Sequence, residues 1–250
     1  MFLINNLDSN IINKQQEIES QAKELGQLCF HLSQQRQTAA RELEILVLEH
    51  LKELGMNKAK FSVKIDQLQD EKGFVEQAGI RYKTTNSGID FVEFFIAANP
   101  GEDLKPLARV ASGGEVSRIM LALKSSLAKV DKIPVLIFDE IDIGISGRIA
   151  QAVGFSLRRL AKTHQIICIT HLPQIASVGD HHFVVEKVSE PTSTRTYVRK
   201  LNNDEKVVEI AKLLGGEAVT DAQLNSAREL IEDAQRRTQV HTDTKNLPVV

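Results

Sequence analysis

Two adjacent carboxylates, Asp139 and Glu140, are the residues of this sequence best placed to do chemistry, because they follow the apolar run 135–138. A short apolar run without alternation predicts a strand buried on both faces, and open α/β sheets bind ligands where such strands end. Neighbouring side chains on extended backbone point in different directions, so one acid can face a hydrated Mg²⁺ while the other faces an attacking water. Asp142 adds a third carboxylate. Metal-assisted charge neutralisation and a positioned nucleophile are what phosphoryl transfer requires.

A second candidate site precedes a predicted helix at about 115–129, where the sequence reads Ser112-Gly113-Gly114-Glu115. Serine followed three residues later by glutamate is a capping box, which needs no glycine. Each glycine in the first turn costs up to about 1 kcal/mol of helix propensity relative to alanine. The pair therefore indicates that another group approaches the backbone closely. Because bare N–H groups at a helix N-terminus bind phosphate, we favour an anion site over a purely structural cap.

The third candidate is His171, which follows the apolar run 166–169. A lone histidine at such a position is more often hydrogen-bonded to backbone than catalytic. One predicted helix, at about 147–162, separates its strand from the strand that ends in Asp139, as in a right-handed βαβ unit. We therefore expect the two strands to lie side by side and their ends to share one site.

The glycine loop that cradles phosphates, Gly-x-x-x-x-Gly-Lys-Ser/Thr, does not occur in these 250 residues. The two Lys-Thr pairs, Lys83-Thr84 and Lys162-Thr163, have no glycine loop before them. The sequence thus contains the later parts of a phosphoryl-transfer site without its first part.

A helical arm and an α/β layer must position these candidates. Apolar residues recur every seven positions from Ile4 to Ala39, and helical periodicity continues to Gly55, where glycine favours a helix end. We expect one long arm or two stacked helices, packed along a narrow seam on a partner or in a local bundle. Further helices are predicted after Pro173, at 204–214 and at 220–238. Strands are predicted at 61–65, 80–82, 88–96, 134–138, 165–169, 182–186 and 195–200.

The alternation of strands and helices favours an α/β fold with a largely parallel sheet. We divide the chain into an arm at 1–55, a head at 56–238 and a polar tail at 239–250. With 31 basic and 33 acidic side chains, the net charge of -2 provides no overall field for nucleic acid or anionic membrane. Apolar runs are far shorter than the ~20 residues that span a bilayer. Two cysteines without a disulfide or metal pattern fit a reducing cytoplasm.

Three parts of this sequence resemble motifs of ABC-type ATPase heads. Ser112 to Glu115 resembles the signature motif, the segment 135–140 resembles the Walker B motif, and His171 resembles the switch histidine. The segments 111–124, 138–147 and 170–176 closely resemble the RecN family of bacterial, SMC-like DNA repair proteins. Ala111, where many ABC-type proteins have a larger residue, agrees with that family and argues against a transporter. The resemblance covers nearly the whole chain but only the C-terminal half of the family's length.

The resemblance implies the C-terminal part of an ABC/SMC-type, P-loop NTPase-like head, with a mostly parallel sheet, preceded by a coiled-coil arm. It implies that Asp139 holds Mg²⁺, that Glu140 is the general base for the water that attacks ATP, and that His171 is the switch residue near the γ-phosphate. The remaining implied roles belong to two segments. The signature residues Ser112, Gly113, Gly114 and Glu115 contact ATP on a second head, and the loop from Asp142 to Ser146 communicates between heads.

The resemblance also implies partners. These are an N-terminal half of the head that carries the Walker A loop, a second head in a homodimer, and DNA through the assembled protein, but no membrane. Such a protein acts in double-strand break repair and recombination, in the cytoplasm at the nucleoid. Without the N-terminal half, the isolated chain is expected to bind ATP weakly and hydrolyse little. Two alternatives stay open: a Mg²⁺-dependent nuclease built on Asp139, Glu140 and Asp142, and a non-catalytic interaction fragment.

Overall fold

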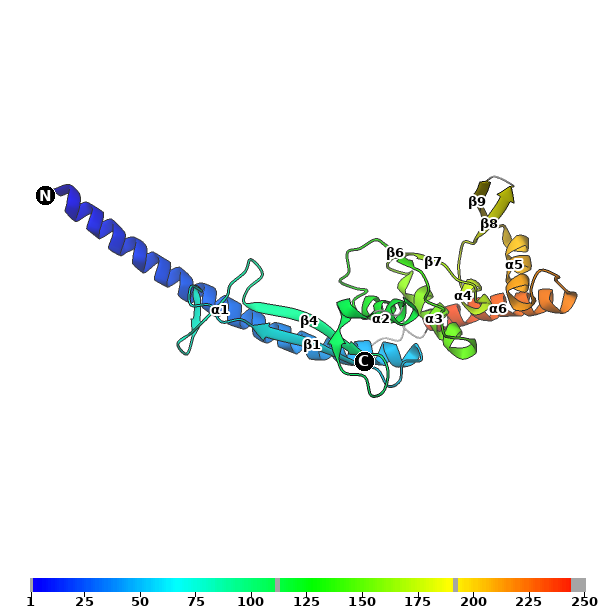
Figure 1. Ribbon diagram of the computed structural model, residues 1–250, viewed down its shortest axis with the longest axis horizontal. Helices are drawn as coiled ribbons and strands as arrows, with labels where there is room; N and C mark the ends of the chain where they lie inside the picture. The colour runs from blue at the N-terminus through cyan, green and yellow to red at the C-terminus, as the bar shows by residue number, and fades with distance from the viewer. Residues whose placement is uncertain (1, 111–112, 191–192, 244–250) are drawn as a thin grey trace. The chain divides into compact units, whose positions relative to one another are not determined.

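The computed structural model describes residues 2–110, 113–190 and 193–243 (Figure 1). The chain forms two compact units: unit 1 comprises Met1–Leu48 and Ala59–Val110, and unit 2 comprises Glu49–Lys58 and Ala111–Val250. The predicted arm therefore shares a unit with the first strands, whereas the sequence division grouped those strands with the head. Within the described residues, no helix is long and apolar enough to cross a membrane.

The arm is one continuous helix, α1, from Phe2 to Glu53, which is the first of the two predicted possibilities. Its end is a Schellman motif: the Met56 N–H donates to the Leu51 carbonyl and the Gly55 N–H donates to the Lys52 carbonyl. Gly55 has a φ of 83°, a left-handed conformation that glycine adopts without strain. The predicted role of Gly55 as helix cap is confirmed.

In unit 1 the two sides of α1 have different surroundings. Several residues of the predicted seam are exposed, namely Ile11, Ile18, Leu25 and Leu32. The residues that α1 buries include Cys29, which forms a small core with Val75 and Ile89. The exposed seam leaves an apolar stripe of α1 available to another helix.

Strands β1 (Lys60–Gln67), β4 (Asp90–Ala97) and β5 (Lys105–Pro106) form an antiparallel sheet in that order. In Figure 1, β1 and β4 run alongside α1. A second pair, β2 (Val75–Gln77) and β3 (Ile80–Tyr82), is also antiparallel, and the 3-10 helix η1 (Leu107–Arg109) follows β5. Glu44 of α1 accepts hydrogen bonds from the Ser62 hydroxyl and the Val63 N–H of β1, which ties the helix to the sheet.

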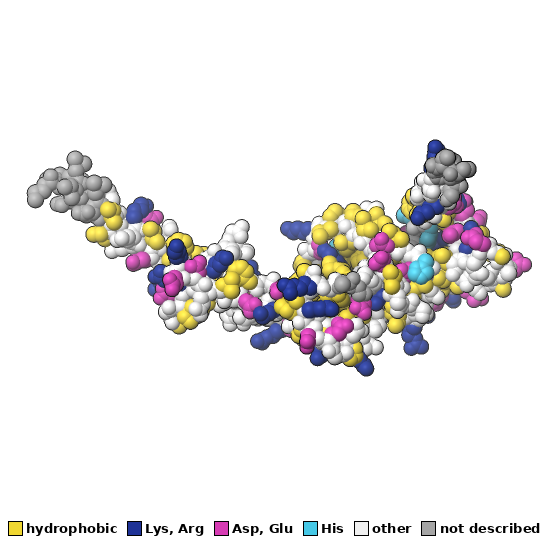
Figure 2. Space-filling view, in the orientation of Figure 1, with side chains coloured by type: hydrophobic (Ala, Val, Ile, Leu, Met, Phe, Trp, Pro, Cys, Tyr) yellow, Lys and Arg dark blue, Asp and Glu magenta, His cyan; other side chains and the backbone are white. Residues whose placement is uncertain are grey.

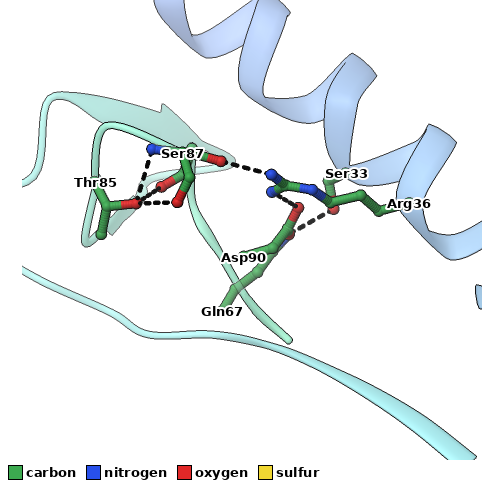
Figure 3. A network of polar contacts seen from close by, with 7 residues as sticks. Ser33, Arg36, Gln67, Thr85, Ser87 and Asp90 are labelled. Carbon is green, nitrogen blue, oxygen red and sulfur yellow. Dashed lines mark hydrogen bonds and ion pairs between the residues drawn. The ribbon is translucent and has the colours of Figure 1, made fainter. Parts of the chain in front are cut away.

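A buried polar network centred on Asp90 joins α1 to the sheet (Figure 3). The Asp90 carboxylate, whose side chain is 0% exposed, accepts hydrogen bonds from Ser33 at 2.8 Å, Arg36 at 3.0 Å and Gln67 at 3.0 Å. Burial acts to raise the pKa of Asp90, but the hydrogen bonds from Gln67, Ser33 and Arg36 and the Arg36 charge together lower it below its ordinary value. The ionised carboxylate is therefore part of the folded structure of unit 1.

Stability of unit 1 is expected to fall in acid because of this carboxyl. Because the pKa of Asp90 in the folded state lies below its ordinary value, its contribution to stability is complete above that ordinary value and is lost as pH falls through the lower folded-state pKa. We expect Asp90→Asn to destabilise unit 1 at neutral pH by about 1.5 kcal/mol and to flatten the acid limb. Urea unfolding of both proteins between neutral pH and acid tests this, and equal acid slopes would contradict it.

Unit 2 contains the predicted strand and helix alternation. Helix α2 (Gly113–Ser126) leads to strand β6 (Val135–Phe138), and helix α3 (Gly147–Leu160) leads to strand β7 (Gln165–Cys168). The chain then forms α4 (Pro173–Ala176), the antiparallel strands β8 (Phe183–Glu190) and β9 (Ser193–Lys200), and helices α5 (Asn203–Gly215) and α6 (Asp221–Asp243). Helix α6 extends five residues past Thr238, into the predicted tail. Residues 244–250 of that tail lie outside the described chain.

Strands β6 and β7 pair in parallel, from Val135 opposite Gln165 to Phe138 opposite Cys168. The α/β class is confirmed, and so is the predicted adjacency of these two strands. Among the described residues parallel pairing is confined to this pair, because the other ladders are antiparallel. The β6–β7 sheet is thus parallel, as predicted, and the three other sheets of the described residues are antiparallel.

The expectation that β6 is buried on both faces is wrong. Leu136 and Phe138 are buried, but Ile137, which points to the opposite face, is 67% exposed. On β7, Ile167 is exposed as well. Figure 2 shows hydrophobic side chains gathered on the surface in this region of the molecule. Within the described residues, one face of the β6–β7 pair thus lacks the apolar cover for which its sequence is suited.

Candidate functional site

The carboxyl ends of β6 and β7 meet. Phe138 and Cys168 pair at the last position of the ladder, and the Ile169 N–H donates to the Phe138 carbonyl at 3.0 Å. Asp139 and Glu140 follow β6 directly, and His171 follows β7 after two residues. The structure therefore places the predicted acid pair and the predicted histidine at neighbouring strand ends.

Asp139 and Glu140 begin the turn segment 139–144 that follows β6. Glu140 has a φ of 59°, a left-handed conformation that is uncommon for a residue with a side chain. Two hydrogen bonds hold the turn: the Glu140 N–H donates to Asp139 Oδ1 at 2.8 Å, and the Ser117 hydroxyl of α2 donates to the Asp139 carbonyl at 2.7 Å. Non-glycine residues in such conformations cluster at functional sites.

The Asp139 side chain fits the requirements of a magnesium ligand. It is exposed, and its Oδ1 accepts a hydrogen bond from the Glu140 N–H, so its Oδ2 is the oxygen that can face a cation. Mg²⁺ typically takes one or two carboxylates together with phosphate oxygens and water. A single available carboxylate at a strand end matches that donor set.

Asp142 lies elsewhere in the turn and has a different environment. Its side chain is 4% exposed, and its Oδ2 accepts hydrogen bonds from the Thr170 hydroxyl at 2.7 Å and the His171 N–H at 2.9 Å. The same oxygen lies 3.0 Å from His171 Nδ1. Burial acts to raise the pKa of Asp142, but these hydrogen bonds and the His171 charge together lower it. Asp142 therefore joins the two strand ends.

A thiol at the same edge is held in its protonated form. Cys168 ends β7 opposite Phe138. Burial, with the nearby charges of Asp142 and Asp139, raises the pKa of its thiol to about 12. Since the thiolate is the reactive form of cysteine, Cys168 is unsuited to act as a nucleophile here.

The first turn of α2 packs against this loop. A Cβ on Gly113 would overlap the Glu140 carboxylate, and a Cβ on Gly114 would lie 2.8 Å from the Ile143 carbonyl oxygen. The close approach that the two glycines predicted is thus made by the protein's own chain, whatever else binds there. Ser112, the predicted cap and phosphate contact, lies outside the described residues.

The other predicted site residues lie around this core. Glu115 occupies the first turn of α2. Ser146 precedes α3 as its N-cap in extended conformation, with no capping bond from its side chain. The nucleotide-contacting roles implied for Glu115 and Ser146 stay predictions.

Sequence reasoning missed three residues that organise the site: Ser117, Arg118 and Thr170. Arg118 is buried in α2 and donates from Nη1 to the carbonyl oxygens of Ile141 and Ile143, at 3.3 and 2.9 Å. The sequence could have indicated Arg118, because an arginine on the apolar face of a helix is a buried charge that needs hydrogen-bond partners. Thr170 carried no signal beyond its place next to His171.

The nuclease alternative is not favoured. The described residues contain no group of three or more His, Cys, Asp or Glu side chains arranged to hold a metal ion. Asp142, the third carboxylate of that hypothesis, is buried and engaged by Thr170 and His171. The three acids therefore do not converge on one cation.

Known proteins similar to this chain include DNA repair proteins RecN of several bacteria. No protein-family model matches the chain. It is 38% identical over 237 residues to DNA repair protein RecN of Bacillus subtilis, which covers 93% of this chain and 41% of that protein. It is 39% identical over 200 residues to DNA repair protein RecN of Vibrio cholerae, covering 80% and 34%.

A solved structure is also similar to part of this chain. The Smc head domain with a coiled coil and joint from Pyrococcus yayanosii aligns with a TM-score of 0.44 at 15% identity, covering 80% of this chain and 30% of that one. The chain spans about two fifths of the length of the Bacillus relative. On the sequence matches, the chain belongs to the RecN family and represents its C-terminal part.

Proposed function

We propose that this chain is the C-terminal portion of a RecN-like ATPase that acts in the repair of DNA double-strand breaks and in recombination. The observation that carries the proposal is the pair of parallel strand ends. One ends in adjacent acids and the other in a histidine, within a chain 38% identical to a DNA repair protein RecN. ATP hydrolysis in this proposal requires an N-terminal part that carries the Walker A loop.

In that reaction Asp139, Glu140 and His171 would each have one task. Asp139 would hold Mg²⁺, which when bound supplies charge neutralisation at the phosphates. Glu140 is exposed and has the carboxylate that accepts a proton from the attacking water. His171, whose side chain is 71% exposed, presents its ring for contact with the terminal phosphate.

The proposed partners follow from incomplete surfaces. The uncovered face of β6 and β7, with Ile137 and Ile167 exposed, suits the N-terminal part of the same head. The exposed seam of α1 suits the returning helix of the arm. A second head would bring its ATP to α2 of this chain, and DNA would be bound by the assembled protein. Such a protein works in the cytoplasm, at the nucleoid.

Complementation tests this proposal. The isolated chain is expected to bind ATP weakly and turn it over little, whereas co-expression with an N-terminal RecN fragment that carries the Walker A loop should yield a complex with Mg²⁺-dependent ATPase activity. A fragment with its Walker A lysine replaced by alanine is the matched control. A stable complex that neither binds nor hydrolyses ATP would favour the non-catalytic interaction fragment instead.

A further inference from the structure

We propose that Asp142 is the positioning residue for His171. Its buried carboxylate holds the imidazole by Nδ1, fixes the tautomer that carries hydrogen at Nδ1, and turns Nε2 outward. The catalytic meaning of this arrangement rests on the proposed function, but the arrangement itself does not.

The carboxylate of Asp142 accepts a hydrogen bond from the backbone N–H of His171 and lies within ion-pair distance of the ring of the same residue. Asp142 Oδ2 lies 2.9 Å from the His171 backbone nitrogen and 3.0 Å from its Nδ1. The two side chains differ sharply in exposure, 4% for Asp142 against 71% for His171. An exposed imidazole normally samples several rotamers, so an anchor at its buried edge restricts the ring while leaving the other edge accessible.

The proton positions follow from the chemistry of the carboxylate. An ionised carboxylate only accepts hydrogen bonds, so the ring nitrogen that faces it must carry hydrogen. In a neutral imidazole the other nitrogen is then an acceptor. His171 therefore presents an unprotonated Nε2 to the site when neutral, and an Nε2–H donor when it has taken up a proton.

Thr170 fixes the carboxylate in turn. Its hydroxyl donates to Asp142 Oδ2 at 2.7 Å and accepts a hydrogen bond from the Leu172 N–H at 3.1 Å. The Thr170 hydroxyl thus both donates and accepts a hydrogen bond. Its bond to Asp142 comes from the strand end that also carries His171. Because Asp142 belongs to the turn that begins with Asp139, this contact fixes His171 relative to the acid pair.

The test is the tautomer of His171, measured by long-range ¹H–¹⁵N spectroscopy on the 250-residue chain with ¹⁵N-labelled histidine, in alkaline buffer without nucleotide. His171→Gln assigns the ring signals. We expect the Nδ1–H form in the unsubstituted chain and a shift toward the Nε2–H form, usual for exposed histidine, in Asp142→Leu. Asp142→Asn keeps the shape of the side chain and replaces the leucine variant if that variant does not fold. It should shift the tautomer of His171 in the same direction.

Asp131→Asn is the matched control, because Asp131 is another acid of unit 2 beside a histidine: its side chain is 10% exposed and lies 3.8 Å from Nε2 of His164. It should move the signals of His164 and leave those of His171 unchanged. An Nε2–H tautomer in the unsubstituted chain, or His171 signals that no Asp142 variant changes, would overturn the proposal.

A second readout separates this inference from the proposed function. In the complemented ATPase, Asp142→Asn should lower turnover on the order of tenfold, as losses of residues that orient a functional histidine do. If the complex has no ATPase activity while the tautomer behaves as expected, the proposed function fails and the positioning role stands.

Discussion

Glu140→Gln is expected to reduce ATP turnover of the complemented chain by about 10²- to 10⁴-fold, the usual contribution of a general base. Glutamine keeps the size of the side chain but has no carboxylate to accept the proton of the attacking water. Steady-state phosphate release measures turnover, and a filter assay measures bound ATP. We expect binding to persist, because Asp139 and the turn that holds it are unchanged.

Glu186→Gln, an equally conservative change at an exposed position of β8, is the control and should leave turnover intact. Two results would contradict the assignment. Unchanged turnover in the complemented Glu140→Gln protein would remove the general base from this residue. Turnover by the purified chain alone, abolished by the same substitution, would show that the N-terminal part is not needed.

Local signals explain what the sequence predicted well. The run 135–138, the helix after it and the run 166–169 each form the expected element, and the crossover through α3 places β6 beside β7, as such units usually do. Asp139 and His171 fall at neighbouring strand ends for that reason. The end of α1 at Gly55 was equally predictable, because a glycine cap depends on only a few residues of backbone.

Contacts between distant segments explain what the sequence did not predict. Asp142 looked like a third ligand because nothing local shows that its side chain turns inward, toward Thr170 and His171 some thirty residues later. The packing of β1 and β4 on α1 likewise depends on Asp90 meeting Ser33 and Arg36 across more than fifty residues. Burial of β6 was overestimated because its apolar run is suited to a cover that the described residues do not provide on the Ile137 face.

Gly114→Ala is expected to destabilise unit 2 by about 2 kcal/mol, within the range for overpacking a filled site. Its new Cβ would lie 2.8 Å from the Ile143 carbonyl oxygen and 3.0 Å from Ile143 Cβ, where backbone would have to move. Helix propensity favours alanine by up to about 1 kcal/mol, so a loss of stability would show that the close approach outweighs it. Urea unfolding with segment-resolved hydrogen exchange measures the effect on unit 2.

Gly26→Ala is the matched control, because Gly26 is also a buried helical glycine but its added Cβ would meet only Val75 Cγ1 at 3.9 Å, an ordinary contact. It should stabilise the arm by about 0.5 to 1 kcal/mol. Opposite signs for the two substitutions, measured without nucleotide, would show that Gly114 is required by the packing of the 140–143 turn in this chain. If both substitutions stabilise the chain, the packing of the turn does not require Gly114, and ATP bound to a second head would be the reason for the glycine.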